Sequence, residues 1–142
     1  MYGGGSEAGV NDADNPARAT SVRGHLRFWW RATRGAAFSS IADLKEKEAE
    51  IWGSMGQASS TTVEVLCQPY NKRRKYSEDY GDFKRYGIES YAIFPASGNE
   101  HDLVEEGLTF ELHLRYSEEH RKDVLCALWA WVNFGGIGAR TR

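Results

Sequence analysis

The chain has 142 residues, a length that suits one domain with a single core. Hydrophobic residues make up 41% of it and aromatic residues 13%, which excludes a disordered tail of low hydrophobicity. The net charge of −2 argues against a uniformly basic nucleic-acid binder. The charges are segregated, however, because residues 18–35 contain five arginines and no acid, and a phosphate backbone responds to local charge.

Neither the cysteines nor the hydrophobic runs suggest a metal centre or a membrane anchor. Cys67 and Cys126 have no partner at metal-ligand spacing, so we expect two free thiols, no metal and no cofactor. The sequence contains no run of about 18 apolar residues and no signal-peptide pattern at its start. We therefore expect a cytoplasmic protein without a membrane partner.

Two helices are predicted in the first third of the chain, after a loop over residues 1–19 that is rich in glycine and acidic or amide residues. Ser21 can cap the first helix, which runs to Arg34 and is closed by Gly35 in a left-handed conformation. At about 100° per residue, one face of this helix is apolar and the adjoining arc is basic. The apolar face contains Val22, Leu26, Trp29, Trp30 and Thr33, and the basic arc contains Arg23, Arg27, Arg31 and Arg34.

The second helix is predicted over Ile41 to Trp52, with Ser40 as its cap and Gly53 as its stop. Glu48 falls in the middle of the apolar face of this helix. An unpaired buried carboxylate is costly, so we expect Glu48 to form a structural ion pair with one of the preceding arginines.

Strands and a third helix follow. Thr61 to Cys67 and Leu108 to Tyr116 alternate between apolar and polar residues and are predicted strands, separated by an exposed insertion over residues 68–107. Ser117 caps a helix that extends to about Asn133, and a glycine loop ends the chain. The inner face of that helix is predicted to consist of Val124, Leu128, Trp131 and Val132, broadened by Leu125 and Trp129.

This order predicts an α+β fold. Adding one strand before residue 1 and one after residue 142 gives the βαββαβ order of a ferredoxin-like or RRM-like domain. We therefore expect residues 1–142 to form a single, truncated domain that lacks its first and last strands.

Three groups of residues are candidates for RNA contact. The four arginines of the basic arc suit phosphates, although one or two could instead be partners of Glu48 or Glu50, and Gly24 could admit a phosphate backbone or serve helix packing. The glycine loop at the end of the chain could wrap RNA, or it could merely end the preceding helix. A run of basic residues among tyrosines in the insertion could bind single-stranded RNA, or it could simply be solvated. The loop candidates are Gly135, Gly136, Gly138, Arg140 and Arg142, and the basic run is Lys72, Arg73, Arg74 and Lys75.

Four segments together resemble the family of first RAMP subunits of the Cmr, or type III-B, CRISPR complex. They are Tyr2–Gly5, Thr20–Arg31 (TSVRGHLRFWWR), Glu48–Ser54 (EAEIWGS) and Phe134–Arg142 (FGGIGARTR). The resemblance implies a ferredoxin-like RAMP domain in a ribonucleoprotein, in contact with guide RNA near its 3′ end, target RNA and other RAMP subunits. Target cleavage would belong to another subunit. In this family a first strand usually precedes the segment that matches Tyr2–Gly5, and the glycine loop usually continues into a second domain. We therefore expect residues 1–142 to correspond to a truncated form of the family's domain.

The leading functional hypothesis is a non-catalytic RNA-binding subunit in antiviral defence. One alternative is a metal-independent endoribonuclease that processes guide RNA through His25, which has no evident acid–base partner in the sequence. Another is a structural subunit that docks neighbouring RAMP proteins. We expect the tryptophans to belong to the core and not to stack on bases.

Overall fold

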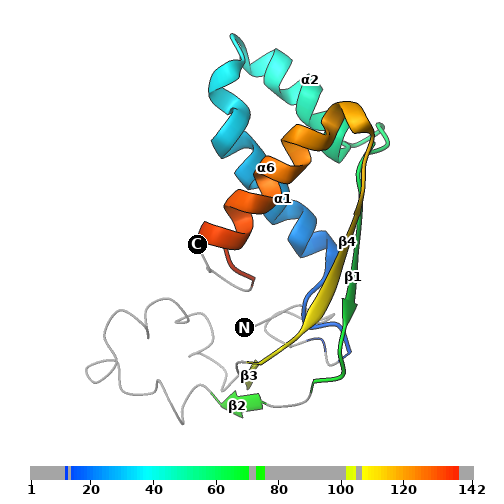
Figure 1. Ribbon diagram of the computed structural model, residues 1–142, viewed down its shortest axis with the longest axis vertical. Helices are drawn as coiled ribbons and strands as arrows, with labels where there is room; N and C mark the ends of the chain where they lie inside the picture. The colour runs from blue at the N-terminus through cyan, green and yellow to red at the C-terminus, as the bar shows by residue number, and fades with distance from the viewer. Residues whose placement is uncertain (1–11, 13, 71–72, 76–101, 105–106, 138–142) are drawn as a thin grey trace, which may run out of the picture. The chain divides into compact units, whose positions relative to one another are not determined.

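The computed structural model describes residues 12, 14–70, 73–75, 102–104 and 107–137 (Figure 1). It confirms the α+β class. In chain order the described elements are α1 (Ala19–Arg34), the 3-10 helix η1 (Gly35–Ala37), α2 (Ile41–Trp52), β1 (Thr62–Cys67), β2 (Arg73–Lys75), β3 (Asp102–Val104), β4 (Phe110–Arg115), the 3-10 helix η3 (Glu118–His120) and α6 (Arg121–Phe134).

The chain divides into two compact units. The first comprises Met1–Arg18, Leu66–Glu111 and Ile137–Arg142, and the second comprises Ala19–Val65 and Leu112–Gly136. In the first unit, β2 pairs with β3 in antiparallel register, with Arg74 opposite Leu103. Part of the basic run expected in an exposed insertion therefore forms a strand, whereas Lys72 and residues 76–101 lie outside the described residues.

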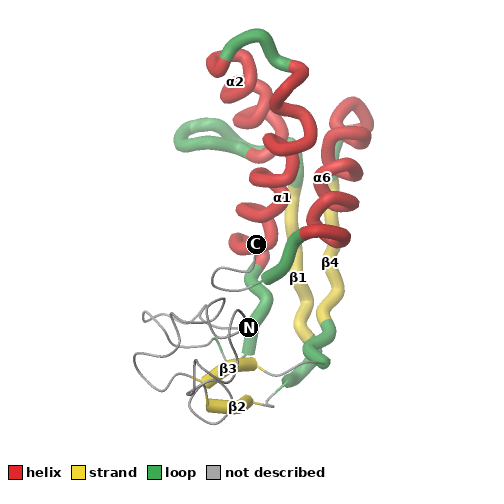
Figure 2. Tube along the Cα trace, turned by 90° about the vertical axis from the view of Figure 1, so that its left-hand side faces the viewer, coloured by secondary structure: helices red, strands yellow, loops and turns green. Residues whose placement is uncertain are grey.

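The second unit contains all the described α-helices and most of β1 and β4, which pair with each other and run in opposite directions (Figure 1). Figure 2 shows α1, α2 and α6 as the helical part of this unit. Its core lies between the helices, where α1 contributes its predicted apolar face, except that Thr33 is exposed and Trp29 only half-buried. The buried apolar residues of the helices are Val22, Leu26, Trp30, Ile51, Trp52, Val124, Ala127, Ala130 and Trp131.

Helix α2 has the bounds that its capping residues predict. The Ser40 side chain accepts a hydrogen bond from the Asp43 N–H (3.1 Å), and Gly53 ends the helix with a φ of 79°. The prediction for Gly35 was wrong, because Gly35 does not adopt a left-handed conformation but begins η1. The Gly35 carbonyl oxygen accepts a hydrogen bond from the Phe38 N–H (3.2 Å). The alanines that follow Gly35 permit one tighter helical turn.

The third predicted helix is displaced at its start and rotated from its predicted face. Ser117 precedes η3 and makes no side-chain cap, and α6 begins at Arg121. Ala127 and Ala130 are buried, whereas Leu125, Trp129 and Val132 are 40%, 60% and 68% exposed, so the predicted inner face was wrong at these positions. The small alanines allow α6 to approach α1 closely, which leaves large apolar side chains on the outer surface.

None of the helices in the described ranges has the length and apolar character needed to cross a bilayer.

Candidate nucleic-acid interface

Arg23 fastens the end of α2. Its Nε donates a hydrogen bond to the Trp52 carbonyl oxygen (2.9 Å), and its Nη2 donates to the same atom. The last carbonyls of a helix have no partner within the helix and carry the negative end of its dipole, so a guanidinium satisfies both needs. A Cβ at Gly53 would lie 2.7 Å from Nη2 of Arg23, so glycine is required there by close approach as well as by its positive φ.

Arg27 and Arg31 face Glu48, which is buried on α2 with only 5% of its surface exposed. Oε1 of Glu48 accepts from Nε of Arg27 (2.8 Å) and lies 2.7 Å from its Nη2. Nε of Arg31 lies 3.8 Å from Oε2 of Glu48, beyond hydrogen-bond distance. Glu48 thus has the arginine partner that its place on the helix requires, and Arg27 is the principal one.

Arg34 ties α1 to α6. Its Nε donates to Oδ1 of Asp123 (2.8 Å), the same atom that accepts from the indole N–H of buried Trp30 (3.0 Å). The Arg34 side chain is 35% exposed, and within the described residues its other nitrogens make no hydrogen bond. One carboxylate therefore satisfies a buried donor and a half-exposed cation.

The arginines of α1 consequently differ in what they can offer an anion. Arg23 and Arg27 are engaged through two nitrogens each, whereas Arg34 is engaged through one. The Arg31 side chain is 50% exposed and has only a long contact. Donors for an external phosphate are therefore concentrated at the C-terminal end of α1, on Arg31 and Arg34.

Two glycines have contrasting surroundings. A Cβ at Gly24 would meet nothing within 4 Å, so the packing explanation for this glycine fails and its backbone is open to solvent. A Cβ at Gly135 would collide with the ring and backbone of Trp131 and lie 2.9 Å from Nε1 of Trp29, so close packing requires this glycine. The Trp131 indole N–H also donates to the Gly136 carbonyl oxygen (3.3 Å).

The remaining predicted RNA contacts lie either outside the described residues or in the first unit. Gly138, Arg140 and Arg142 lie outside the described part of the chain, as does Lys72. The strand β2, which contains Arg73, Arg74 and Lys75, belongs to the first unit.

His25 is held against an aromatic ring. Its imidazole stacks on Trp131, with ring centroids 6.3 Å apart and planes 8° from parallel. Partial burial lowers the pKa of His25 below its ordinary value, because desolvation disfavours the charged form. Within the described residues no acid or base forms a hydrogen bond with His25, whereas general acid–base cleavage of RNA requires two groups flanking the phosphate.

Sequence reasoning missed an exposed aromatic cluster, which we define as Phe28, Trp29, Trp129 and Phe134. Phe28 packs edge-on against Trp29 with centroids 5.4 Å apart, and Phe134 lies 6.0 Å from Trp29 and 5.6 Å from Trp129. Phe28, Trp129 and Phe134 are 53%, 60% and 59% exposed. The assignment of every tryptophan to the core was therefore wrong for Trp129. The residue pattern carries no signal for this, because α6 is apolar on several sides.

Sequence reasoning also missed that Asp123 accepts hydrogen bonds from both Trp30 and Arg34. It also missed the close approach of Glu50, Glu119 and His120. Asp123 carried a weak signal, as an acid in the first turn of its helix. Glu50 is distant in sequence from the adjacent residues Glu119 and His120, so their contact depends on how α2 packs in the unit.

Comparison with known proteins identifies consistent relatives. The model of the RAMP superfamily matches residues 1–142. The "CRISPR system Cmr subunit Cmr1-1" of Pyrococcus furiosus is 30% identical over 127 residues, which cover 88% of this chain and 38% of that protein. The Cmr1-2 subunit of the same organism is 28% identical over 154 aligned positions, covering 92% of this chain and 81% of the relative. The chain thus spans well under half of the first relative.

The fold has a solved counterpart. The crystal structure of Cmr1 from Pyrococcus furiosus in its apo form superposes with a TM-score of 0.63, at 24% identity, over 87% of this chain and 38% of that one. At this identity the likeness concerns the fold alone, and it agrees with the mixed helix and strand order described above.

Proposed function

The chain belongs to the RAMP superfamily, and from this membership we propose that it is a non-catalytic RNA-binding subunit of a CRISPR type III-B (Cmr) ribonucleoprotein. Relatives named as Cmr subunits, which match about nine-tenths of the chain, support the assembly. Within it, the subunit contacts guide RNA near its 3′ end, target RNA or both, and its protein partners are other RAMP subunits.

The observation that carries RNA binding is the half-exposed guanidinium pair at the end of α1. Arg31 and Arg34 lie one helical turn apart and keep donors that no described residue occupies. A guanidinium presents its donors in a planar fork that matches two phosphate oxygens. Gly24, in the second turn of α1, extends this surface toward the start of the helix, because its exposed backbone leaves room for close approach.

The surroundings of His25 support the non-catalytic part of the proposal. A ring that is stacked on Trp131 and biased toward its neutral form can accept a proton, but cleavage also requires a donor for the leaving oxygen. Cleavage of labelled guide precursor without metal, abolished by His25→Gln, would contradict a non-catalytic role.

The test of RNA binding compares two arginines of similar exposure. Arg31→Gln removes a cation from the proposed interface, whereas Arg121→Gln removes one from the first turn of α6, where it pairs with Glu118 and is 58% exposed. We expect Arg31→Gln to weaken binding of single-stranded RNA and to lower the slope of log affinity against log salt by about one phosphate contact. Equal losses in both variants would show attraction without a defined interface.

A second candidate function, docking of a neighbouring protein subunit, is favoured by the exposed aromatic cluster. Contiguous exposed aromatic surface is typical of protein interfaces, where large rings often carry most of the binding energy. Replacing Trp129 with Ser should weaken co-purification with other RAMP subunits, whereas Ile41→Ser, at an apolar position that is 72% exposed on α2, should not. If both replacements leave assembly unchanged, the aromatic cluster is not a docking surface.

A further inference from the structure

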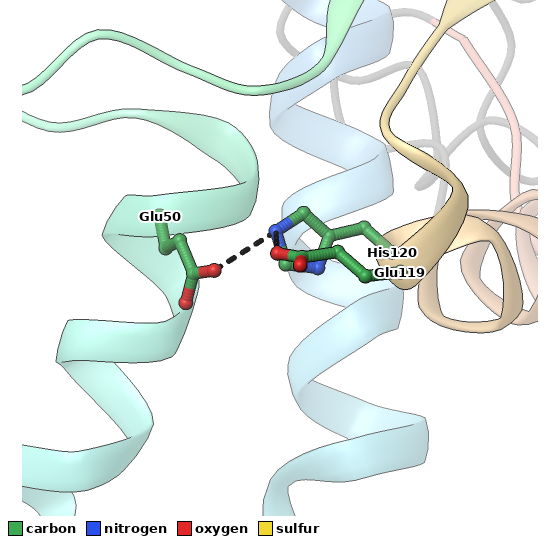
Figure 3. Close-up of side chains that lie close together, drawn as sticks. All are labelled: Glu50, Glu119 and His120. Carbon is green, nitrogen blue, oxygen red and sulfur yellow. Dashed lines mark ion pairs between the residues drawn. The ribbon is translucent and has the colours of Figure 1, made fainter.

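Three side chains that commonly ligate metals converge between α2 and η3 (Figure 3). Nε2 of His120 lies 3.0 Å from Oε1 of Glu50 and 3.0 Å from Oε1 of Glu119. The three ligand atoms all lie within 4.8 Å of one another. Glu50 comes from the last turn of α2, whereas Glu119 and His120 are adjacent in η3.

The convergence places two anionic oxygens against one nitrogen. An imidazole nitrogen carries either one proton or one lone pair, so a single N–H cannot point well at two carboxylates, and a lone pair would repel both. Water cannot easily relieve this conflict at His120, whose side chain is only 2% exposed. A bound cation removes the conflict, because all three atoms then donate electron pairs to it.

The spacing suits a small divalent ion. Zinc binds histidine nitrogen and carboxylate oxygen at about 2.0–2.2 Å, so tetrahedral ligands lie about 3.3 Å apart. The two nitrogen–oxygen separations of 3.0 Å are close to that value. Nζ of Lys47 lies 2.7 Å from Oε2 of Glu50, which holds this carboxylate with its other oxygen directed at His120. Such outer contacts orient metal ligands in known sites.

We propose that Glu50, Glu119 and His120 bind a divalent cation of the zinc class, through Nε2 of the histidine and one oxygen of each glutamate. The fourth position is left for water. The imidazole ligand favours Zn²⁺ over Mg²⁺, which prefers oxygen ligands alone. The ion fastens the end of α2 to the segment that leads into α6, so its first effect is on stability, independently of RNA.

The proposal is tested by calorimetric titration of the chelator-treated full chain with Zn²⁺, and separately with Mg²⁺. We expect about one equivalent of Zn²⁺ to bind and no binding of Mg²⁺ to be detected. Glu119→Gln should weaken Zn²⁺ binding more than about tenfold, since even the loss of an outer partner costs about 10–100-fold. Glu118→Gln is the matched control, because this neighbouring glutamate is 82% exposed and pairs with Arg121 instead.

A stability readout complements the titration. Zn²⁺ should raise the melting temperature of the parent chain and of Glu118→Gln, and raise it less in Glu50→Gln and Glu119→Gln, since a ligand that binds the folded state stabilises it. These two variants keep the test decisive if replacement of buried His120 unfolds the chain. Failure of the parent chain to bind Zn²⁺, or equal affinity in the Glu118 and Glu119 variants, would overturn the proposal and leave the cluster as a contact between a buried histidine and two glutamates.

Discussion

Replacing Arg27 with Met should destabilise the chain more than neutralising its partner Glu48. The pair is asymmetric, because Glu48 is buried with 5% of its surface exposed, whereas the Arg27 side chain is 36% exposed. Removing Arg27 leaves a buried carboxylate whose nearest remaining cation, Arg31, lies 3.8 Å away. Removing the charge of Glu48 instead leaves a cation that water can reach.

The magnitudes follow from this asymmetry. Loss of one partner of a buried pair costs about 3–5 kcal/mol. If half-exposed Arg31 moves closer to Glu48 after this loss, the new ion pair recovers about 0.2–1 kcal/mol of stability. We therefore expect Arg27→Met to cost about 3 kcal/mol. Glu48→Gln should cost about 1 kcal/mol, because the amide oxygen still accepts a hydrogen bond from Arg27.

Urea unfolding of the two single variants and the double variant provides the assay. The double variant should be more stable than Arg27→Met alone, because the neutral amide that Glu48→Gln introduces no longer leaves a buried charge without a partner. The reasoning is refuted if Arg27→Met lowers the free energy of unfolding less than Glu48→Gln does while it weakens RNA binding more than about tenfold. Arg27 would then act mainly in ligand binding and not in stabilising the fold.

Three further outcomes are expected. Gly135→Ala should destabilise the fold by about 1–3 kcal/mol through collision with Trp131, whereas Gly24→Ala should stabilise it by up to about 1 kcal/mol, both measured by urea unfolding. Asp123→Ala should cost about 1–3 kcal/mol by removing the acceptor of two hydrogen bonds from α1, which thermal unfolding would detect. Because the pKa of His25 is lowered in the folded chain, its contribution to stability is present above pH 6.5 and is lost as pH falls toward the folded pKa. His25→Gln should flatten that pH dependence, and an NMR titration of the imidazole that gives a value at or above 6.5 would contradict it.

Local signals predicted the elements that carry their own boundaries. Helix α2 is bounded by Ser40 and Gly53, which act through their own side chain or backbone, so the sequence is sufficient. The strands were recognised by alternation, and the structure shortens them only at their ends. The apolar face of α1 was correct at Val22, Leu26 and Trp30 because the rest of this helix is polar or basic enough to fix the phase.

Features that depend on packing between elements could not be predicted in the same way. Which acid meets which arginine is decided by the placement of α2 and α6 against α1, so Asp123 was not foreseen as the partner of Arg34. The buried face of α6 follows Ala127 and Ala130, whose small size matters only once α1 lies beside them. The cluster of Glu50, Glu119 and His120 likewise has no local spacing to reveal it.

Because Glu48 is buried and paired with Arg27, it competes with any anionic ligand for the arginines of α1. A phosphate that bound Arg27 in place of Glu48 would leave this carboxylate buried without its ion-pair partner, at a cost of about 3–5 kcal/mol. A phosphate that bound Arg31 would not incur this cost. The guanidinium of Arg31 is therefore more available to a polyanion than that of Arg27. A ligand that bound both arginines would weaken the contact between α1 and α2. Occupancy of this surface and the orientation of the second helix are thermodynamically linked.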